Sequence, residues 1–131
     1  MNTPIVKFCS SCGSVVRLEI PAGDNRERHV CTQCETIHYH NPRIITGCIP
    51  VFADQVLLCK RAIEPRLGFW TLPAGFLELG ESVAEGAARE TEEEAGAQVQ
   101  MGELFCMFNL PHIGQVYMMY LAQLTEPVFA S

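Results

Sequence analysis

The sequence contains no apolar run long enough to cross a bilayer, so we expect no membrane-spanning segment. Its first residues, MNTPIVKF, lack the basic and then apolar pattern of a secretory signal. Basic residues are scarce, because nine lysines and arginines stand against 15 acidic residues and give a net charge of -6. Nucleic-acid binders usually carry a positive surface. The charge therefore argues against a nucleic-acid partner.

Seven cysteines in a chain without a secretory signal indicate a reducing compartment, which predicts a cytoplasmic location. Four of them form two Cys-x-x-Cys pairs separated by 18 residues. This spacing is typical of a tetrahedral four-thiolate site that holds structural zinc, with rubredoxin-like iron as the alternative. The expected zinc ligands are Cys9, Cys12, Cys31 and Cys34.

The chain divides into two parts by pattern. Residues 1–40 are short and cysteine-paired, with a hairpin expected from residues 15–20 and 26–30, and residues 41–131 form the second domain. Asn41-Pro42 is the expected joint, because proline keeps the preceding residue extended. Strands are expected at 44–52, 56–63, 68–72, 99–108 and 116–124, with a break at 73–75. One helix is expected at 82–95, so the fold class is mixed α/β (α+β).

The expected helix has clear end signals. Ser82 and Glu85 have the spacing of a capping box, in which each side chain bonds the other residue's backbone N–H. Gly96 lies where a left-handed helix stop is needed. Small residues recur at helical spacing and form a face suited to close packing on a sheet.

The acidic residues of this helix crowd its C-terminal end, where they oppose the helix dipole and repel one another. Glu90 and Glu94 share one face, and Glu93 lies beside them. Carboxylate oxygens are preferred ligands of Mg²⁺ and Mn²⁺, and such ions bridge to phosphate oxygens. Charge alone fits a solvated acidic face better, so the spacing of the whole segment has to decide between the two interpretations.

That spacing is Gly75, five residues, Glu81, seven residues, and then Arg89-Glu90-Thr91-Glu92-Glu93-Glu94-Ala95-Gly96-Ala97. It resembles the signature box of the Nudix hydrolases at every charged and glycine position. Thr91 and Ala97 depart from it, since the family prefers bulkier aliphatic residues there. The departures concern local packing rather than chemistry.

The resemblance extends over Cys9 to about Val128. A four-cysteine ribbon followed by HYHNPR (38–43) is the order found in zinc-ribbon Nudix enzymes such as NADH pyrophosphatase. The SQPWPFP stretch of the NADH enzymes is missing here. The segment FNLPHIGQVY (108–117) is instead similar to plant chloroplast Nudix hydrolases that act on FAD and ADP-ribose.

The resemblance implies a fold, a Nudix α/β/α sandwich with a mixed sheet behind a zinc ribbon. Nudix domains generally continue with a further strand and helix, so we expect residues 41–131 to be an incomplete domain or one completed by a partner. Ribbon-bearing relatives are often dimers, which by analogy predicts a homodimer.

The resemblance also implies roles for the box residues. Glu90 and Glu94 would be the principal Mg²⁺ (or Mn²⁺) ligands, with Glu93 and the Ala74 carbonyl completing the set. Arg89 would hold Glu81. The structural positions of the box are Gly75, Glu81 and Gly96, and its catalytic group is Glu90, Glu93, Glu94 and Arg89.

The function implied is metal-dependent cleavage of the diphosphate in FAD, ADP-ribose or NADH, with water as the nucleophile. Trp70, Phe76 and Tyr117 are candidates to stack on the base of a nucleotide substrate, with core packing as their alternative role. Two other functions stay open. One is a non-catalytic module that senses a nucleotide, and the other is a zinc ribbon that binds nucleic acid.

Overall fold

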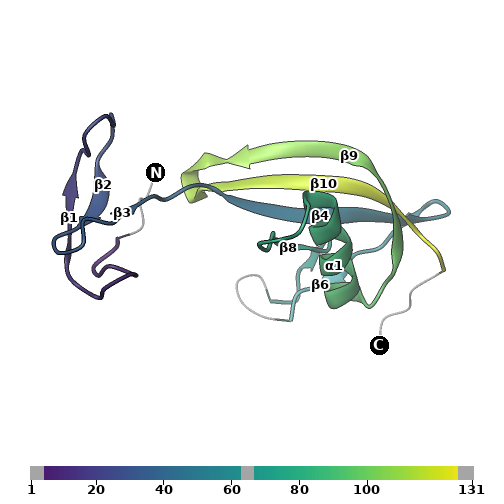
Figure 1. Ribbon diagram of the computed structural model, residues 1–131. Helices are drawn as coiled ribbons and strands as arrows, with labels where there is room; N and C mark the ends of the chain where they lie inside the picture. Colours follow the sequence, from purple (N-terminus) through teal and green to yellow (C-terminus); the bar gives the residue numbers. More distant parts are fainter. Residues whose placement is uncertain (1–4, 63–66, 127–131) are drawn as a thin grey trace. The chain divides into compact units, whose positions relative to one another are not determined.

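The computed structural model describes residues 5–62 and 67–126. The chain forms two compact units, residues 1–41 and residues 42–131. Figure 1 labels most of the strands and helix α1.

The first unit is a small three-stranded antiparallel sheet. Strand β1 (Val16–Glu19) pairs with β2 (Arg28–Cys31), which confirms the expected hairpin. A short third strand, β3 (Ile37–His38), adds to the other edge of β2. Few side chains of this unit are buried, and two of those are Cys9 and Cys31. Apolar burial alone therefore stabilises this unit poorly.

The second unit is built on a mixed sheet whose long strands lie in the order β4-β10-β9. Strand β4 (Arg43–Phe52) runs parallel to β10 (Gln115–Leu124), and β9 (Val99–Leu110) is antiparallel to β10. The short 3₁₀ helix η1 (Pro111–Ile113) lies between β9 and β10. The other edge of β4 pairs with β5 (Gln55–Val56) and β8 (Ala74–Phe76). The mixed α/β class is thus confirmed.

The region between β5 and β8 differs from the prediction. Residues 57–58 lie between β5 and β6 (Cys59–Lys60), so the expected 56–63 strand is broken, and its last residue lies outside the described residues. Strand β7 (Trp70–Thr71) covers only the middle of the expected 68–72 strand and pairs with β6.

The expected break at 73–75 is wrong for its last two residues, which begin β8. The backbone at Pro73 and Ala74 closely approaches β4, and this approach explains why β8 pairs with β4. A β-carbon at Gly47 of β4 would collide with the Pro73 carbonyl, and that carbonyl accepts a 3.1 Å hydrogen bond from the Cys48 N–H. Pro73 lacks a donor but still supplies an acceptor to the neighbouring strand.

Helix α1 (Val83–Ala95) forms as its end signals predict. The Ser82 hydroxyl accepts from the Glu85 N–H at 3.1 Å, and the Glu85 carboxylate accepts from the Ser82 N–H at 2.9 Å. Gly96 ends the helix with φ 63°, and its N–H bonds the Glu92 carbonyl. The capping box and the glycine stop are both confirmed.

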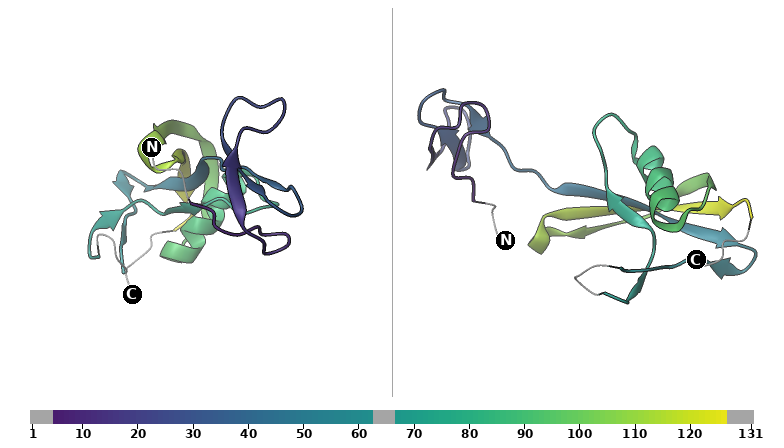
Figure 2. Two further views of the ribbon diagram at one scale, coloured as in Figure 1. Left: turned by 90° about the vertical axis from the view of Figure 1, so that its left-hand side faces the viewer. Right: turned by 90° about the horizontal axis from the view of Figure 1, so that it is seen from below.

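Helix α1 packs against one face of the β4-β10-β9 sheet (Figures 1 and 2). Small side chains meet there, since Cys48, Ala87 and Ala122 form the buried cluster. A β-carbon at Gly86 would lie 2.8 Å from the Thr46 methyl group, so the helix backbone rests almost directly on the sheet. The Thr46 hydroxyl also donates to the Val83 carbonyl at 2.7 Å.

Within residues 5–62 and 67–126, α1 is the one α-helix, so the second helical layer of the expected sandwich is not among the described elements. Half-exposed apolar side chains such as Phe76 and Phe108 also occur on this unit. In the described part of the chain, no helix has the length and apolar character needed to span a membrane.

Candidate functional site

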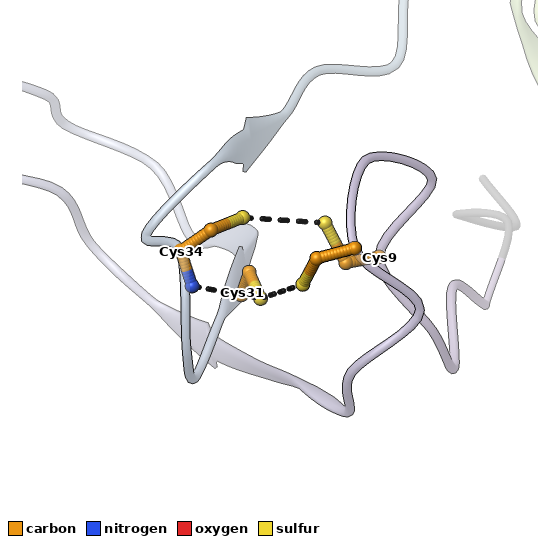
Figure 3. A group of neighbouring side chains, drawn as sticks. Cys9, Cys31 and Cys34 are labelled. Carbon is orange, nitrogen blue, oxygen red and sulfur yellow. Dashed lines mark hydrogen bonds between the residues drawn. The ribbon is translucent and has the colours of Figure 1, made fainter.

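The four paired cysteines form one cluster in the first unit. Their sulfur atoms all lie within 4.8 Å of one another, with Cys9 Sγ 3.6 Å from Cys34 Sγ and Cys12 Sγ 3.4 Å from Cys31 Sγ. Figure 3 shows the labelled sulfurs turned toward each other from the two knuckles. Backbone amides face the sulfurs, as when Ser11 N donates to Cys9 and Gln33 N to Cys31, each at 3.3 Å.

The electrostatics of this cluster favour a bound cation. Burial opposes ionisation of Cys9, but hydrogen bonds from the Cys12 and Ser11 amides outweigh it and lower the pKa of the thiol to about 5. The Cys34 and Gln33 amides likewise lower the pKa of Cys31, yet burial and the neighbouring sulfurs outweigh them and raise it. Four crowded sulfurs, partly charged and mutually repelling, fit a tetrahedral zinc ion.

Arg89 organises the acidic loop-helix segment of the second unit. Its guanidinium binds both Glu81 oxygens, at 2.7 and 2.9 Å, and donates to the Phe76 carbonyl at 3.1 Å. Its Nη1 also contacts Glu90 at 2.9 Å and Glu93 at 3.1 Å. Arg89 thus ties the loop after β8 to α1, and the predicted pairing of Arg89 with Glu81 is present.

Two carboxylates of α1 lie against the β8 backbone. A β-carbon at Gly75 would collide with the Glu90 carboxylate, and the Ala74 N–H donates to Glu94 Oε2 at 3.1 Å. Partial desolvation raises the pKa of Glu94, and the adjacent Glu90 raises it further against the effect of the Ala74 amide. Two neighbouring carboxylates against one strand are a hard-oxygen donor pair suited to a divalent cation.

Glu93 is held differently from this pair. Its side chain is 59% exposed and bound to Arg89. The structure therefore places Glu90 and Glu94 against β8, while Glu93 shares the Arg89 Nη1 donor with Glu90. Ala74 contacts Glu94 through its N–H, so the predicted role of its carbonyl stays a prediction.

Replacing Glu81 with glutamine should change how stability depends on pH. The hydrogen bond from Arg89 lowers the pKa of Glu81 to about 2, below its value of about 4.5 in an unfolded chain. The ion pair therefore stabilises the fold above about pH 4.5, and this stabilisation is lost as the pH falls toward 2. The far-UV helical signal followed on heating at several pH values should show a smaller acid-induced loss of Tm in Glu81→Gln than in the wild type.

Glu92→Gln is the matched control for this measurement, because Glu92 is an exposed acid of the same segment. Its Tm should follow the wild-type pH dependence. If Glu81→Gln also follows that curve, the ion pair does not contribute to the acid sensitivity of the domain.

Two of the three aromatic candidates, Trp70 and Phe76, are too exposed to be core residues. Trp70 is 60% exposed, with Lys60 Nζ 6.0 Å from its ring centre, and Phe76 is 46% exposed beneath the Arg43 guanidinium, 5.2 Å away. Tyr117 stacks on Phe108 with ring centres 4.8 Å apart.

Phe76 and Tyr117 also share one level of the sheet. Both pair with Ile45 of β4, Phe76 across one edge and Tyr117 across the other. Gly75 faces Glu90, so the alternation of side chains along β8 turns Phe76 to the face of the sheet opposite the carboxylates.

Some neighbours of the two sites were missed by sequence reasoning. The charge of Glu94 helps to raise the pKa of Cys59, which places that thiol near the carboxylate pair. Ser14, Thr36 and His38 surround the cysteine cluster. The spacing of the cysteines indicates only the ligands, so it could not identify these outer residues.

Each of the two units matches the model of a known protein family. The Nudix N-terminal zinc-ribbon model matches residues 7–40, and the NUDIX domain model matches residues 41–127. The chain belongs to the Nudix family. A crystal structure of a Nudix hydrolase from Nitrosomonas europaea is similar, with 56% identity and a TM-score of 0.89 over 93% of this chain and 69% of that one.

Two further Nudix proteins are less similar to this chain. An NAD-capped RNA hydrolase NudC from Photobacterium profundum is 36% identical over 118 residues, 88% of this chain and 41% of the relative. The chain thus spans about two fifths of that curated protein. An ADP-ribose pyrophosphatase from Streptococcus suis, 22% identical with a TM-score of 0.60 over 70% of this chain and 66% of that one, shares the Nudix fold.

Proposed function

We propose that this Nudix chain is an Mg²⁺- or Mn²⁺-dependent hydrolase that cleaves the diphosphate of a nucleotide derivative into two monophosphates. The observation that carries the proposal is the carboxylate pair of Glu90 and Glu94 against the β8 backbone, with Glu90 at Gly75 and held by Arg89, and Glu94 bound to the Ala74 N–H. The family match supports the same interpretation.

In this proposal Glu90 and Glu94 bind the cation. The Glu93 side chain is largely exposed, so it can change rotamer, leave Arg89 and join them. When bound, such an ion polarises a phosphoryl group and lowers the pKa of bound water. Arg89 keeps the loop at a fixed distance from the helix through Glu81 and the Phe76 carbonyl. The absence of a side chain at Gly75 lets the Glu90 carboxylate lie directly against the β8 backbone.

FAD and ADP-ribose are the favoured substrates, with NADH next. The half-exposed ring of Phe76 lies under the Arg43 guanidinium, which could meet a phosphate. Base stacking on such a ring is worth about 1–3 kcal/mol. Incubation with FAD, ADP-ribose and NADH under Mg²⁺, followed by chromatography, should show two monophosphate products from at least one of them.

A metal-free incubation with excess chelator serves as the control and should show no product. Absence of turnover for every substrate, with Mg²⁺ and with Mn²⁺, would favour the non-catalytic alternative, a Nudix module that senses a nucleotide. All the box glutamates are present, which favours catalysis.

An NAD-capped RNA is a second candidate substrate. The acidic composition argues against a nucleic-acid partner, but the NudC relatives carry the name of NAD-capped RNA hydrolases, and this counts against that expectation. A capped oligonucleotide and free NADH, compared at equal concentration, would separate the two. If the capped oligonucleotide is cleaved faster than NADH, and this difference in rate decreases as the salt concentration rises, the result would indicate contacts to the RNA backbone. The cytoplasmic location stays a prediction from the seven cysteines of the chain.

A further inference from the structure

The cysteine cluster is surrounded by side-chain hydrogen-bond donors as well as by backbone amides. The Thr36 hydroxyl lies 3.0 Å from Cys34 Sγ, and Ser14 hydrogen-bonds to Cys12. The buried Cys9 has His38 as a side-chain hydrogen-bond partner in addition to Cys34. Each knuckle therefore has polar side chains arranged around its sulfurs.

His38 has an unusual environment. It lies on β3, the last strand of the ribbon, directly opposite His29 of β2. Its Nε2 is buried, and among the described residues it has no conventional hydrogen-bond partner. Its ring nevertheless lies near enough to Cys9 to hydrogen-bond with the sulfur. A buried ring nitrogen without a partner costs free energy, so its position requires an explanation.

One arrangement accounts for both observations, an N–H···S bond from the imidazole to Cys9, which is longer than an ordinary N–H···O bond. Cys9 is only 4% exposed, so water cannot easily replace this donor. Four thiolates around a divalent cation leave two excess negative charges, and outer donors disperse them.

We propose that His38 is a positioning residue of the ribbon metal centre, donating its ring N–H to the Cys9 sulfur and thereby slowing metal loss. His38 is not a ligand, because the four cysteines already complete a tetrahedral set. The proposal concerns the ribbon alone and does not depend on the hydrolytic function.

The test compares His38→Gln with His38→Met in the full chain. The two side chains are similar in size, but only glutamine can donate an N–H to the sulfur. Zinc affinity, measured by competition with a metallochromic chelator, should fall about 10- to 100-fold in His38→Met and be largely kept in His38→Gln. Zinc release should be faster in the methionine variant. In the cobalt-loaded protein, its thiolate-to-metal charge-transfer bands should shift.

His40→Ala is the control, because His40 belongs to the same segment and packs on His29 rather than on a cysteine. It should retain wild-type affinity and cobalt bands. Equal affinities for the glutamine and methionine variants would overturn the proposal. An equal loss in His40→Ala would overturn it as well, since the effect would then reflect ribbon packing.

Discussion

Replacing Glu94 with glutamine is expected to lower kcat for any diphosphate that the chain hydrolyses by about 100- to 1,000-fold. Glutamine keeps the size of the side chain but removes one of the two neighbouring carboxylate charges. A bound cation stabilises transition-state charge by several kcal/mol, and losing about 3–4 kcal/mol of that corresponds to this decrease. Steady-state kinetics on the best substrate of the panel would measure it, with Mn²⁺ binding followed by calorimetry.

The control is Glu92→Gln, which removes the same charge from an exposed position of the same helix. It should leave kcat and Mn²⁺ affinity nearly unchanged. Glu93→Gln distinguishes an Arg89 partner from a cation ligand. A large loss of kcat and Mn²⁺ affinity would show that Glu93 leaves Arg89 to bind the cation with Glu90 and Glu94. Wild-type kinetics in Glu94→Gln would remove Glu94 from the catalytic group.

Stripping the ribbon metal should unfold residues 5–41 and leave the second unit folded. The ribbon buries few apolar side chains, whereas structural zinc contributes an apparent ~10–16 kcal/mol to the folding of small zinc domains, on the order of their whole stability. The second unit has its own sheet and helix core. Backbone amide hydrogen exchange with and without a strong zinc chelator should show loss of protection in β1 to β3 only.

Cys31→Ser should reproduce the effect of the chelator, because Cys31 is fully buried in the cluster. Cys106→Ser is its control, since Cys106 is a half-buried thiol of β9 that lies outside the cluster. Equal loss of protection in both units would show that they fold as one cooperative body. Unchanged protection in both would show that the ribbon needs no metal.

Local rules predict much of this chain. The ends of α1 follow from Ser82, Glu85 and Gly96, because caps depend on neighbouring residues only. The cysteine cluster follows from the spacing of its pairs, since a Cys-x-x-Cys knuckle is itself a local structure. The parallel pairing of β4 with β10 links segments about 70 residues apart, and no local pattern predicts it; the family resemblance implies only that the sheet is mixed.

Contacts between distant segments account for what was missed. Strand β8 follows a proline and contains a glycine, so its local sequence suggests a break, yet the edge of β4 recruits it. The Glu93 side chain is bound to Arg89, and residue spacing alone could not predict that partner. His38 lowers the pKa of Cys9, which lies on a knuckle 29 residues earlier in the chain.

The glycines at two backbone contacts have a consequence for the precision of the carboxylate pair. Gly86 rests on β4 and Gly75 rests on Glu90, one full helical turn beyond Gly86. Neither glycine contributes a rotatable side chain to its contact, so the helix has no alternative packing distance that a change of rotamer there could supply. The distance between the helix backbone and β4 is therefore set by main-chain geometry at Gly86, and it should vary little with temperature, whereas the Glu90 carboxylate at Gly75 is held by its own rotamer and by Arg89.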